Sequence, residues 1–580
     1  MAPGSNRLQD PGEEFAQLGI LTRHFFERLF RNDIVDFADQ MKARLIAVLA
    51  ILAVIVGWSS YFLVFFKYEF SPDVNTSWQD KNYVFLLVMI LFGIVTFLEW
   101  EVLFPDRRDF VNLTPLPVRM RTVFAAKLAS FVAFIGLFSV AMNSLSSVAF
   151  ALFLAQWRSN SVLFLARHVL AHLASAFAAC FCVFFACVFV NFFLMAVLPS
   201  ALYRRASGLV RFLLIGLLVF LLLTFLVEPG SLSGAIRSLA KLKDHGSPLL
   251  FHIPSLWFVG LYEVLLGSKD PAFIALSRTA GWALGLSFGA FGLACALSYF
   301  KHYRKTLESA KRRRWPRRYR EGAAGLLQSL VLRSPEERAV GMFFSRTIRS
   351  SPRHRAVLVN GLAVGAALVM VAIVASRRNL QALDPANTYF LAQSLLLVFV
   401  LLAGLRVVVD VPAALESNWI FRVTESAARP RYVAGLKKTI FVQWSLPLAA
   451  LIFLTHLWLW KDGRTALLHA VFCLALSGLG IEAFFFRYRK VPFASTHVPG
   501  KLQLQTRMVP YLAGLLALLA ALAGLEKALL NHPGRFWVFL PVSAFLWAFL
   551  RIRNARFLKD HPLIYDEEPE PAMIGFPEDA

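Results

Sequence analysis

The sequence predicts an all-α polytopic membrane protein, with about twelve transmembrane helices in two parallel six-helix halves. Hydrophobic residues make up 58% of the 580 residues and charged residues only 17%. Apolar stretches of about 20 residues, enough to cross a bilayer core as a helix, recur along the chain. They are too long and too continuously apolar for barrel strands, which leaves helices. A residue pattern in the first half also recurs in the second, which predicts an internal repeat.

Twelve stretches have the length and apolarity of a span. The first half contains those at 43–66, 83–104, 122–154, 163–197, 209–228 and 271–300. The second half contains those at 354–376, 388–411, 435–460, 464–486, 507–526 and 535–552. The third and fourth stretches are longer than a bilayer core requires, so we expect them to extend beyond it or to tilt.

Five regions follow from this pattern. A cytoplasmic N-terminal region at 1–42 precedes the first membrane half at 43–300, and a basic cytoplasmic linker at 301–353 leads to the second half at 354–552. The acidic, proline-containing tail at 553–580 is expected to be disordered. Apolar residues and arginines intermingle over 19–34 and again over 342–348. Each of these two segments is expected to form an amphipathic helix at the membrane interface, just before the first span of its half.

Lysine and arginine set the orientation. The segment 301–320 carries ten basic residues and one acidic residue, Glu308, and the other basic loops fall on the same side of the predicted membrane. That side is therefore expected to be cytoplasmic and to hold both termini, in a cell membrane such as the bacterial inner membrane. Topology accounts for most of the formal net charge of +24. The expected partner of the basic loops is an anionic lipid bilayer surface, and no nucleic acid.

The internal repeat is clearest in the loop before the third span of each half. Five residues recur 310 positions later: Thr114, Arg119, Arg121, Val123 and Lys127 as Thr424, Arg429, Arg431, Val433 and Lys437. A second match aligns Phe25–Arg31 with Phe343–Arg349, ahead of the first span of each half. Two matches in the same order at similar offsets favour two similar halves in the same orientation.

The order of elements and the stretch Leu113–Lys127 resemble the type 2 permease class of ABC transporters, membrane subunits with a type V exporter fold. The resemblance implies a cytoplasmic coupling helix after the second span of each half, over 110–121 and 420–431, which contacts an ATPase. In the first half it assigns this role to Thr114, Pro115, Leu116, Pro117, Val118, Arg119, Arg121 and Lys127. In the second half it assigns it to Thr424, Arg429, Arg431 and Lys437, although 425–427 departs from the Pro-Leu-Pro pattern.

The chain lacks its own ATP-binding loop. No Gly-x-x-x-x-Gly-Lys-[Ser/Thr] motif occurs, and Gly500-Lys501 is followed by Leu502. We therefore expect a permease without enzymatic activity or a cofactor. A separate cytosolic ABC ATPase, in two copies, would drive transport, and the resemblance indicates export. No motif identifies the transported substrate.

Ionisable residues inside spans are candidate functional residues because their burial in a membrane is costly. They are Glu99, Glu101, Arg406, Asp410 and Glu482. Arg406 and Asp410 are spaced to form an ion pair on one helix face, and Glu482 is close in sequence to Arg487. His168 and His172 share the same spacing, but without a third ligand we interpret them as structural rather than metal-binding.

The outer segment before the sixth span is too short and interrupted to cross the membrane. Pro254 interrupts it, and Glu263 would be costly at mid-membrane. We expect short interfacial or re-entrant helices over 250–268, with Trp257 and Tyr262 at the headgroup level.

Two other classes remain open. A twelve-span secondary transporter, driven by an ion gradient and built from two parallel halves, would also have a basic central loop. An integral membrane enzyme would need clustered acidic or histidine residues at an interface, and no such set is evident in the sequence.

Overall fold

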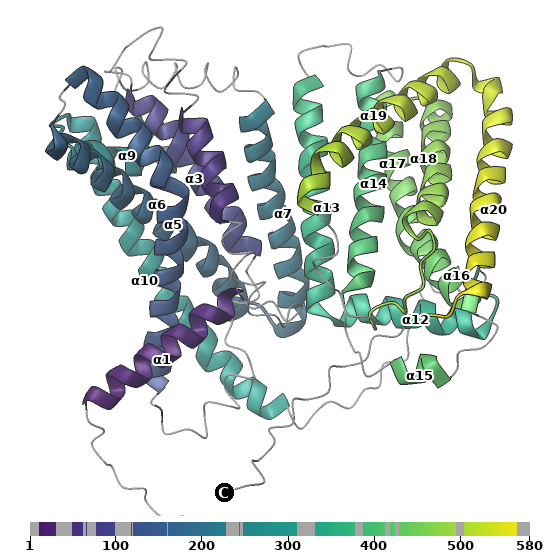
Figure 1. Ribbon diagram of the computed structural model, residues 1–580, viewed down its shortest axis with the longest axis horizontal. Coiled ribbons are helices and arrows are strands. Elements are labelled where there is room, and N and C mark those ends of the chain that lie inside the picture. The colour runs from purple at the N-terminus through teal and green to yellow at the C-terminus, as the bar shows by residue number, and fades with distance from the viewer. Residues whose placement is uncertain are drawn as a thin grey trace, which may run out of the picture. The chain divides into compact units, whose positions relative to one another are not determined.

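The computed structural model describes residues 11–30, 49–61, 65, 77–98, 118, 120–158, 161–227, 243, 247–309, 331–376, 387–411, 418–423, 429–494 and 504–564. Over these residues the chain is almost entirely helical, and the β-pairing described is one isolated bridge between Lys490 and Ile564. The predicted all-α class is confirmed. The chain divides into two compact units, Met1–Arg313 and Arg314–Ala580, and their boundary falls within the predicted linker (Figure 1).

The first unit is built around α6 (Val162–Val197). Its other elements are α1 (Pro11–Phe30), a helix at 49–61, α3 (Ser77–Leu98), α5 (Met120–Arg158), α7 (Ser200–Val227), η2 (Pro248–His252), α9 (Pro254–Leu265) and α10 (Pro271–Ser309). Helices α3, α5, α9 and α10 all pack on α6. Much of the core consists of phenylalanine rings, among them Phe131, Phe134, Phe184 and Phe185.

The second unit has its core between α14 (Thr388–Asp410) and α18 (Gly463–Phe484). Its other elements are α12 (Pro335–Ser350), α13 (Pro352–Ser376), α15 (Asn418–Val423), α16 (Arg429–Ile440), the π-helical turn η5 (Phe441–Ser445), α17 (Leu446–Trp460), α19 (Leu504–Asn531), η6 (Pro533–Arg535) and α20 (Phe536–Asp560). Helix α12 lies across the lower end of the unit as drawn in Figure 1 and packs on α16. Helices α16, η5 and α17 form one continuous span.

Nine described segments are long and apolar enough to cross a membrane. They are Ser77–Leu98, Ala125–Leu154, Val162–Val197, Ala206–Thr224, His354–Val371, Phe390–Asp410, Arg429–Trp460, Gly463–Phe484 and Pro533–Asp560. Each coincides with a predicted span. The predicted spans at 43–66, 271–300 and 507–526 are helical where described, as the helix 49–61, α10 and α19, without meeting that criterion. The structure therefore supports a multi-pass helical membrane protein.

Helix α3 begins at Ser77, earlier than the predicted span at 83–104. Lys81, which the predicted span at 83–104 leaves outside the membrane, lies inside this helix and is 2% exposed. The structure satisfies its charge within the protein, because Lys81 Nζ contacts Glu263 Oε1 at 2.6 Å. The next residue, Asn82, accepts a hydrogen bond of 2.7 Å from the Ser255 hydroxyl. Polar residues can extend this helix because α9 provides their partners.

Candidate functional site

An amphipathic helix packs against the start of a long span in the first unit. Leu21 and Phe25 of α1 are buried against Ala126 of α5. The Thr122 hydroxyl donates a hydrogen bond of 3.2 Å to Glu14 Oε1, and Lys127 Nζ lies 5.8 Å from the centroid of the Phe25 ring. The predicted interfacial helix thus holds the first turns of the third predicted span.

The second unit repeats this packing between α12 and α16. Lys438 Nζ contacts Glu337 Oε2 at 2.7 Å, and Arg431 pairs with Glu336 at 3.6 Å. Ser345 donates a hydrogen bond of 3.0 Å to Gln443 in the π-helical turn. In both units, then, the helix that carries the repeated Phe-Phe sequence lies on the helix that begins with the repeated basic residues.

The coupling residues predicted for the first half lie largely outside the described residues. Thr114, Pro115, Leu116, Pro117 and Arg119 are not described, and neither is the side chain of Arg121. Val118 packs against the cluster of Leu21 and Phe25. The predicted coupling helix at 110–121 therefore stays a prediction.

In the second half, a six-residue helix, α15, occupies the start of the predicted coupling segment 420–431. Thr424 lies outside the described residues, and Arg429 and Arg431 belong to the first turn of α16. The predicted coupling role of Lys437 also stays a prediction. Its side chain is buried between helices, because an ion pair inside the unit holds it.

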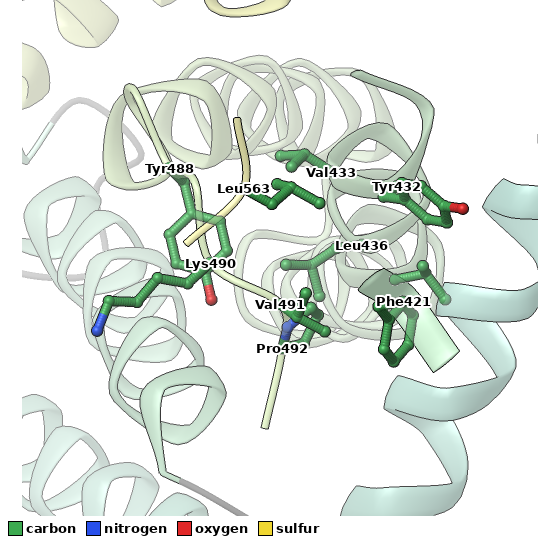
Figure 2. A pocket seen from close by; sticks show the side chains of 10 residues that line it. Phe421, Tyr432, Val433, Leu436, Tyr488, Lys490, Val491, Pro492 and Leu563 are labelled. Atoms are coloured by element: carbon green, nitrogen blue, oxygen red, sulfur yellow. The ribbon is translucent and has the colours of Figure 1, made fainter. Parts of the chain in front are cut away.

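Phe421 anchors α15 to the rest of the unit. It is 8% exposed, and its ring lies 5.7 Å from that of Phe343 and 6.2 Å from that of Tyr432. Figure 2 shows Phe421 and Tyr432 at a small crevice, which is also lined by Val340, Val433, Leu436, Tyr488, Lys490, Val491, Pro492 and Leu563. The crevice has a volume of about 10 Å³, room for one water at most. It is a packing junction that joins α12, α15, α16 and the segment after α18, and no ligand site.

Glu482, near the end of α18, forms a buried ion pair. Its Oε2 contacts Lys437 Nζ at 2.5 Å and accepts a hydrogen bond of 2.8 Å from Asn554 Nδ2. Three spans, α16, α18 and α20, therefore meet at one carboxylate. Arg487, its neighbour in sequence, instead lies over the Phe486 and Phe557 rings. Helix α18 ends at Phe484, so Arg487 is not on the same helix.

Arg406 and Asp410 form the ion pair that their spacing predicted. Arg406 Nε also donates a hydrogen bond of 3.1 Å to the Phe484 carbonyl, and its guanidinium lies 4.8 Å from the Tyr488 ring centroid. These contacts connect the end of α14 to the end of α18, which indicates a structural role. Glu99 and Glu101 lie outside the described residues.

The predicted outer segment forms a helical hairpin with the next span. Pro254 is the first residue of α9, whose twelve residues are too few to cross a membrane, and Gly267 (φ 90°) ends it. Trp257 Nε1 donates a hydrogen bond of 2.9 Å to the Phe251 carbonyl.

Tyr262 was predicted at the headgroup level, and that depth stays a prediction. Tyr262 is fully buried, and burial raises the pKa of its hydroxyl. Lys81 Nζ lies 4.3 Å from its ring centroid and pairs with Glu263. The apolar residues of α9 face the interior of the unit, where they pack on α3, α6 and α10.

His168 and His172 face the interior of the first unit. His172 Nε2 lies 3.1 Å from the Ser146 hydroxyl, and His168 Nδ1 lies 3.0 Å from the Phe164 carbonyl. Among the described residues, no group of three or more His, Cys, Asp or Glu side chains could hold a metal ion.

One cluster of ionisable residues was not predicted from the sequence. His469 Nδ1 contacts Glu526 Oε1 at 2.5 Å, and both side chains are fully buried. The His456 ring lies 4.5 Å from the His469 ring, centroid to centroid, and its Nε2 lies 3.5 Å from the Ser394 hydroxyl. His456 belongs to α17, His469 to α18 and Glu526 to α19. Their sequence separations follow no motif; the only available signal was an ionisable residue inside each predicted span or at its end.

A large cavity opens between α16, α18 and α20. It lies at the helix ends where Glu482 contacts Lys437 and Asn554. Its volume is about 810 Å³. Four basic side chains line it, Arg431, Lys437, Lys438 and Arg551, with two acidic ones, Glu337 and Glu482. The remaining lining is mostly apolar and includes Phe441, Leu474, Leu540 and Trp547.

Taken together, the helices and buried ion pairs define a polytopic α-helical membrane protein. Comparison with protein-family models, curated proteins and solved structures finds no match.

Proposed function

We propose that this chain is the permease of an ATP-driven transporter of the ABC exporter type, with ATP hydrolysed by a separate cytosolic subunit. Two permease halves in one chain would receive two ATPase copies, one at each coupling segment. The proposal accounts for the basic loops, which the lysine and arginine distribution assigns to the cytoplasm, and for the absence of a phosphate-binding loop from the sequence.

The repeated packing of an amphipathic helix on the first turns of a long span carries this proposal. In both units the helix ahead of the first span contacts the span that follows the basic loop. A force applied at that loop would therefore reach the interface helix and the membrane helix together. In the second unit, α15 offers a contact point, because Val423 is 78% exposed while Phe421 anchors the helix.

The experiment measures ATP hydrolysis by the purified full-length chain, alone and co-expressed with ATPase subunits of its source genome. We expect no activity from the chain alone and activity in the complex. Val423→Asp adds a charge to an exposed side chain and should abolish complex formation while leaving the fold intact. Leu249→Asp, at a residue 57% exposed on the predicted outer side, is the matched control. Full complex formation by Val423→Asp would exclude α15 as the coupling surface.

A second candidate is a transporter driven by an ion gradient, and the buried His469–Glu526 contact favours it. Buried His and Glu side chains can carry protons along a membrane pathway. In proteoliposomes, a proton gradient without ATP would then drive uptake or release, and Glu526→Gln would abolish it. Transport that requires ATP and survives Glu526→Gln would leave the pair a structural role.

A further inference from the structure

We propose that the cavity between α16, α18 and α20 binds an anionic phospholipid of the cytoplasmic leaflet. Its phosphate would lie at Arg551, and one acyl chain would lie along the apolar wall. The proposal does not depend on the source of transport energy.

The cavity is polar at one end and apolar at the other. Lys437, Glu482 and Asn554 mark its polar end on three different helices. Along each helix toward the opposite end, the lining becomes apolar, and it reaches Phe441 at the start of η5, Val471 on α18 and Leu540 on α20. From Asn554 to Leu540, α20 rises by about 20 Å, comparable with the roughly 15 Å of one leaflet. This change from a polar to an apolar lining matches a phospholipid whose headgroup lies at the polar end and whose acyl chain extends into the leaflet.

Arg551 gives the cavity its anion-binding character. Lys437 and Lys438 are each neutralised by a glutamate in the cavity wall, at 2.5 Å and 2.7 Å. Among the described residues, no carboxylate lies within ion-pair distance of Arg551, whose guanidinium lies 4.9 Å from the Trp547 ring centroid. The Trp547 ring can orient the guanidinium while its N–H groups remain available. A phosphate fits such a donor better than a neutral headgroup does.

The apolar wall includes small residues among its larger side chains. Gly478 lies opposite Phe441 and Trp547, and a Cβ placed on it would meet them only at 3.7–3.9 Å. Ala475 and Ala544 continue this lining. The π-helical turn, which begins at Phe441, interrupts the regular packing on the same wall. An acyl chain would fill the space that these side chains leave.

The test uses the full-length chain in nanodiscs containing phosphatidylglycerol with a photoreactive acyl chain. Mass spectrometry then locates the labelled peptides. We expect labels at 471–478 and 540–547, and about tenfold less labelling in Arg551→Gln, the loss of one charge-assisted contact. Arg553→Gln is the matched control, because Arg553 lies on the same helix over the Phe486 ring and does not line the cavity. Replacing the probe by its phosphatidylcholine analogue should reduce labelling to a similar extent.

A second pair of variants tests the apolar wall separately. Ala475→Trp fills the wall without changing charge and should also abolish labelling, whereas Ala483→Trp, on the exposed face of α18, should not. Equal labelling of Arg551→Gln and the parent chain would overturn the proposal. Competition by millimolar inorganic phosphate without any effect of Ala475→Trp would indicate a free-anion site and would also overturn it. Absence of label from both peptides in the parent chain would likewise overturn the proposal.

Discussion

Gly435 of α16 lies directly against the backbone of Glu337 in α12, since a Cβ at Gly435 would meet the Glu337 carbonyl oxygen at 2.6 Å. The two helices approach this closely only because the position has no side chain. Gly435→Ala should therefore push α12 away and destabilise the second unit by about 1–3 kcal/mol, the usual range for overpacking. Thermal unfolding in detergent measures the change.

Gly524→Ala is the control for this variant. Gly524 also lies within a helix, but nothing is within 4 Å of a Cβ placed there. Alanine favours helix over glycine, so this variant should be neutral or more stable by up to about 1 kcal/mol. Equal effects of the two substitutions would contradict the close approach of α12 and α16.

The Lys437–Glu482 pair should show strong energetic coupling. Lys437→Met leaves the Glu482 carboxylate without its cation and is expected to cost about 3–5 kcal/mol. Adding Glu482→Gln should restore part of that loss, because the remaining amide is neutral. A double-mutant cycle on unfolding free energies measures the coupling. The exposed pair Arg23–Glu27 on α1, treated in the same way, should give less than about 1 kcal/mol. Additive effects at Lys437 and Glu482 would be inconsistent with the ion pair.

Asp270 should make stability depend on pH. Burial disfavours its charge, but hydrogen bonds from Lys243 and the Ala272 N–H outweigh that effect and lower its pKa below the ordinary value of 3.8. A lowered folded-state pKa stabilises the fold above pH 3.8, and this contribution disappears as pH falls through the folded-state pKa.

Melting temperatures at pH 7 and pH 3 test this contribution. The difference between the parent chain and Asp270→Asn should be present at pH 7 and shrink at pH 3. Asp270→Ala should cost about 1 kcal/mol more than Asp270→Asn, because alanine also removes the cap at the start of α10. A parent-to-Asn difference that is the same at both pH values would refute the role of the carboxylate charge.

Cysteine labelling tests the predicted orientation. A membrane-impermeant maleimide added outside intact cells should label Leu249→Cys, which replaces an exposed residue of η2, and should not label Val423→Cys until the cells are permeabilised. Val259→Cys, at a fully buried position of α9, should resist labelling in both conditions. Labelling of Leu249→Cys and Val423→Cys from the same side would reverse the topology of one unit.

Local spacing predicted the helices and the contacts within them. Nine predicted spans coincide with apolar helices, and the Arg406–Asp410 pair forms because residues four apart share a helix face. Contacts between distant segments were not predicted. Lys437 and Glu482 are 45 positions apart, and His469 and Glu526 are 57 positions apart, so no local period relates them.

The burial of Lys81 and of Tyr262 was not predicted, for one shared reason. Lysine is common in loops and tyrosine is common at the membrane interface. Both side chains are nevertheless buried here. Each is the other's neighbour, since the ammonium lies over the ring, and Glu263 completes the group. Hydropathy treats each residue alone and cannot register polar groups that satisfy one another inside a membrane protein.

The π-helical turn at Phe441–Ser445 sets the rotational phase of the span it interrupts. An extra residue in one turn rotates everything beyond it by about 100° relative to an uninterrupted α-helix. With this turn in place, Phe441 faces the cavity while His456 faces His469. Deleting Gln443 would leave the hydropathy profile almost unchanged but swing His456 to a different side of the helix. For this segment, residue count matters as much as residue type.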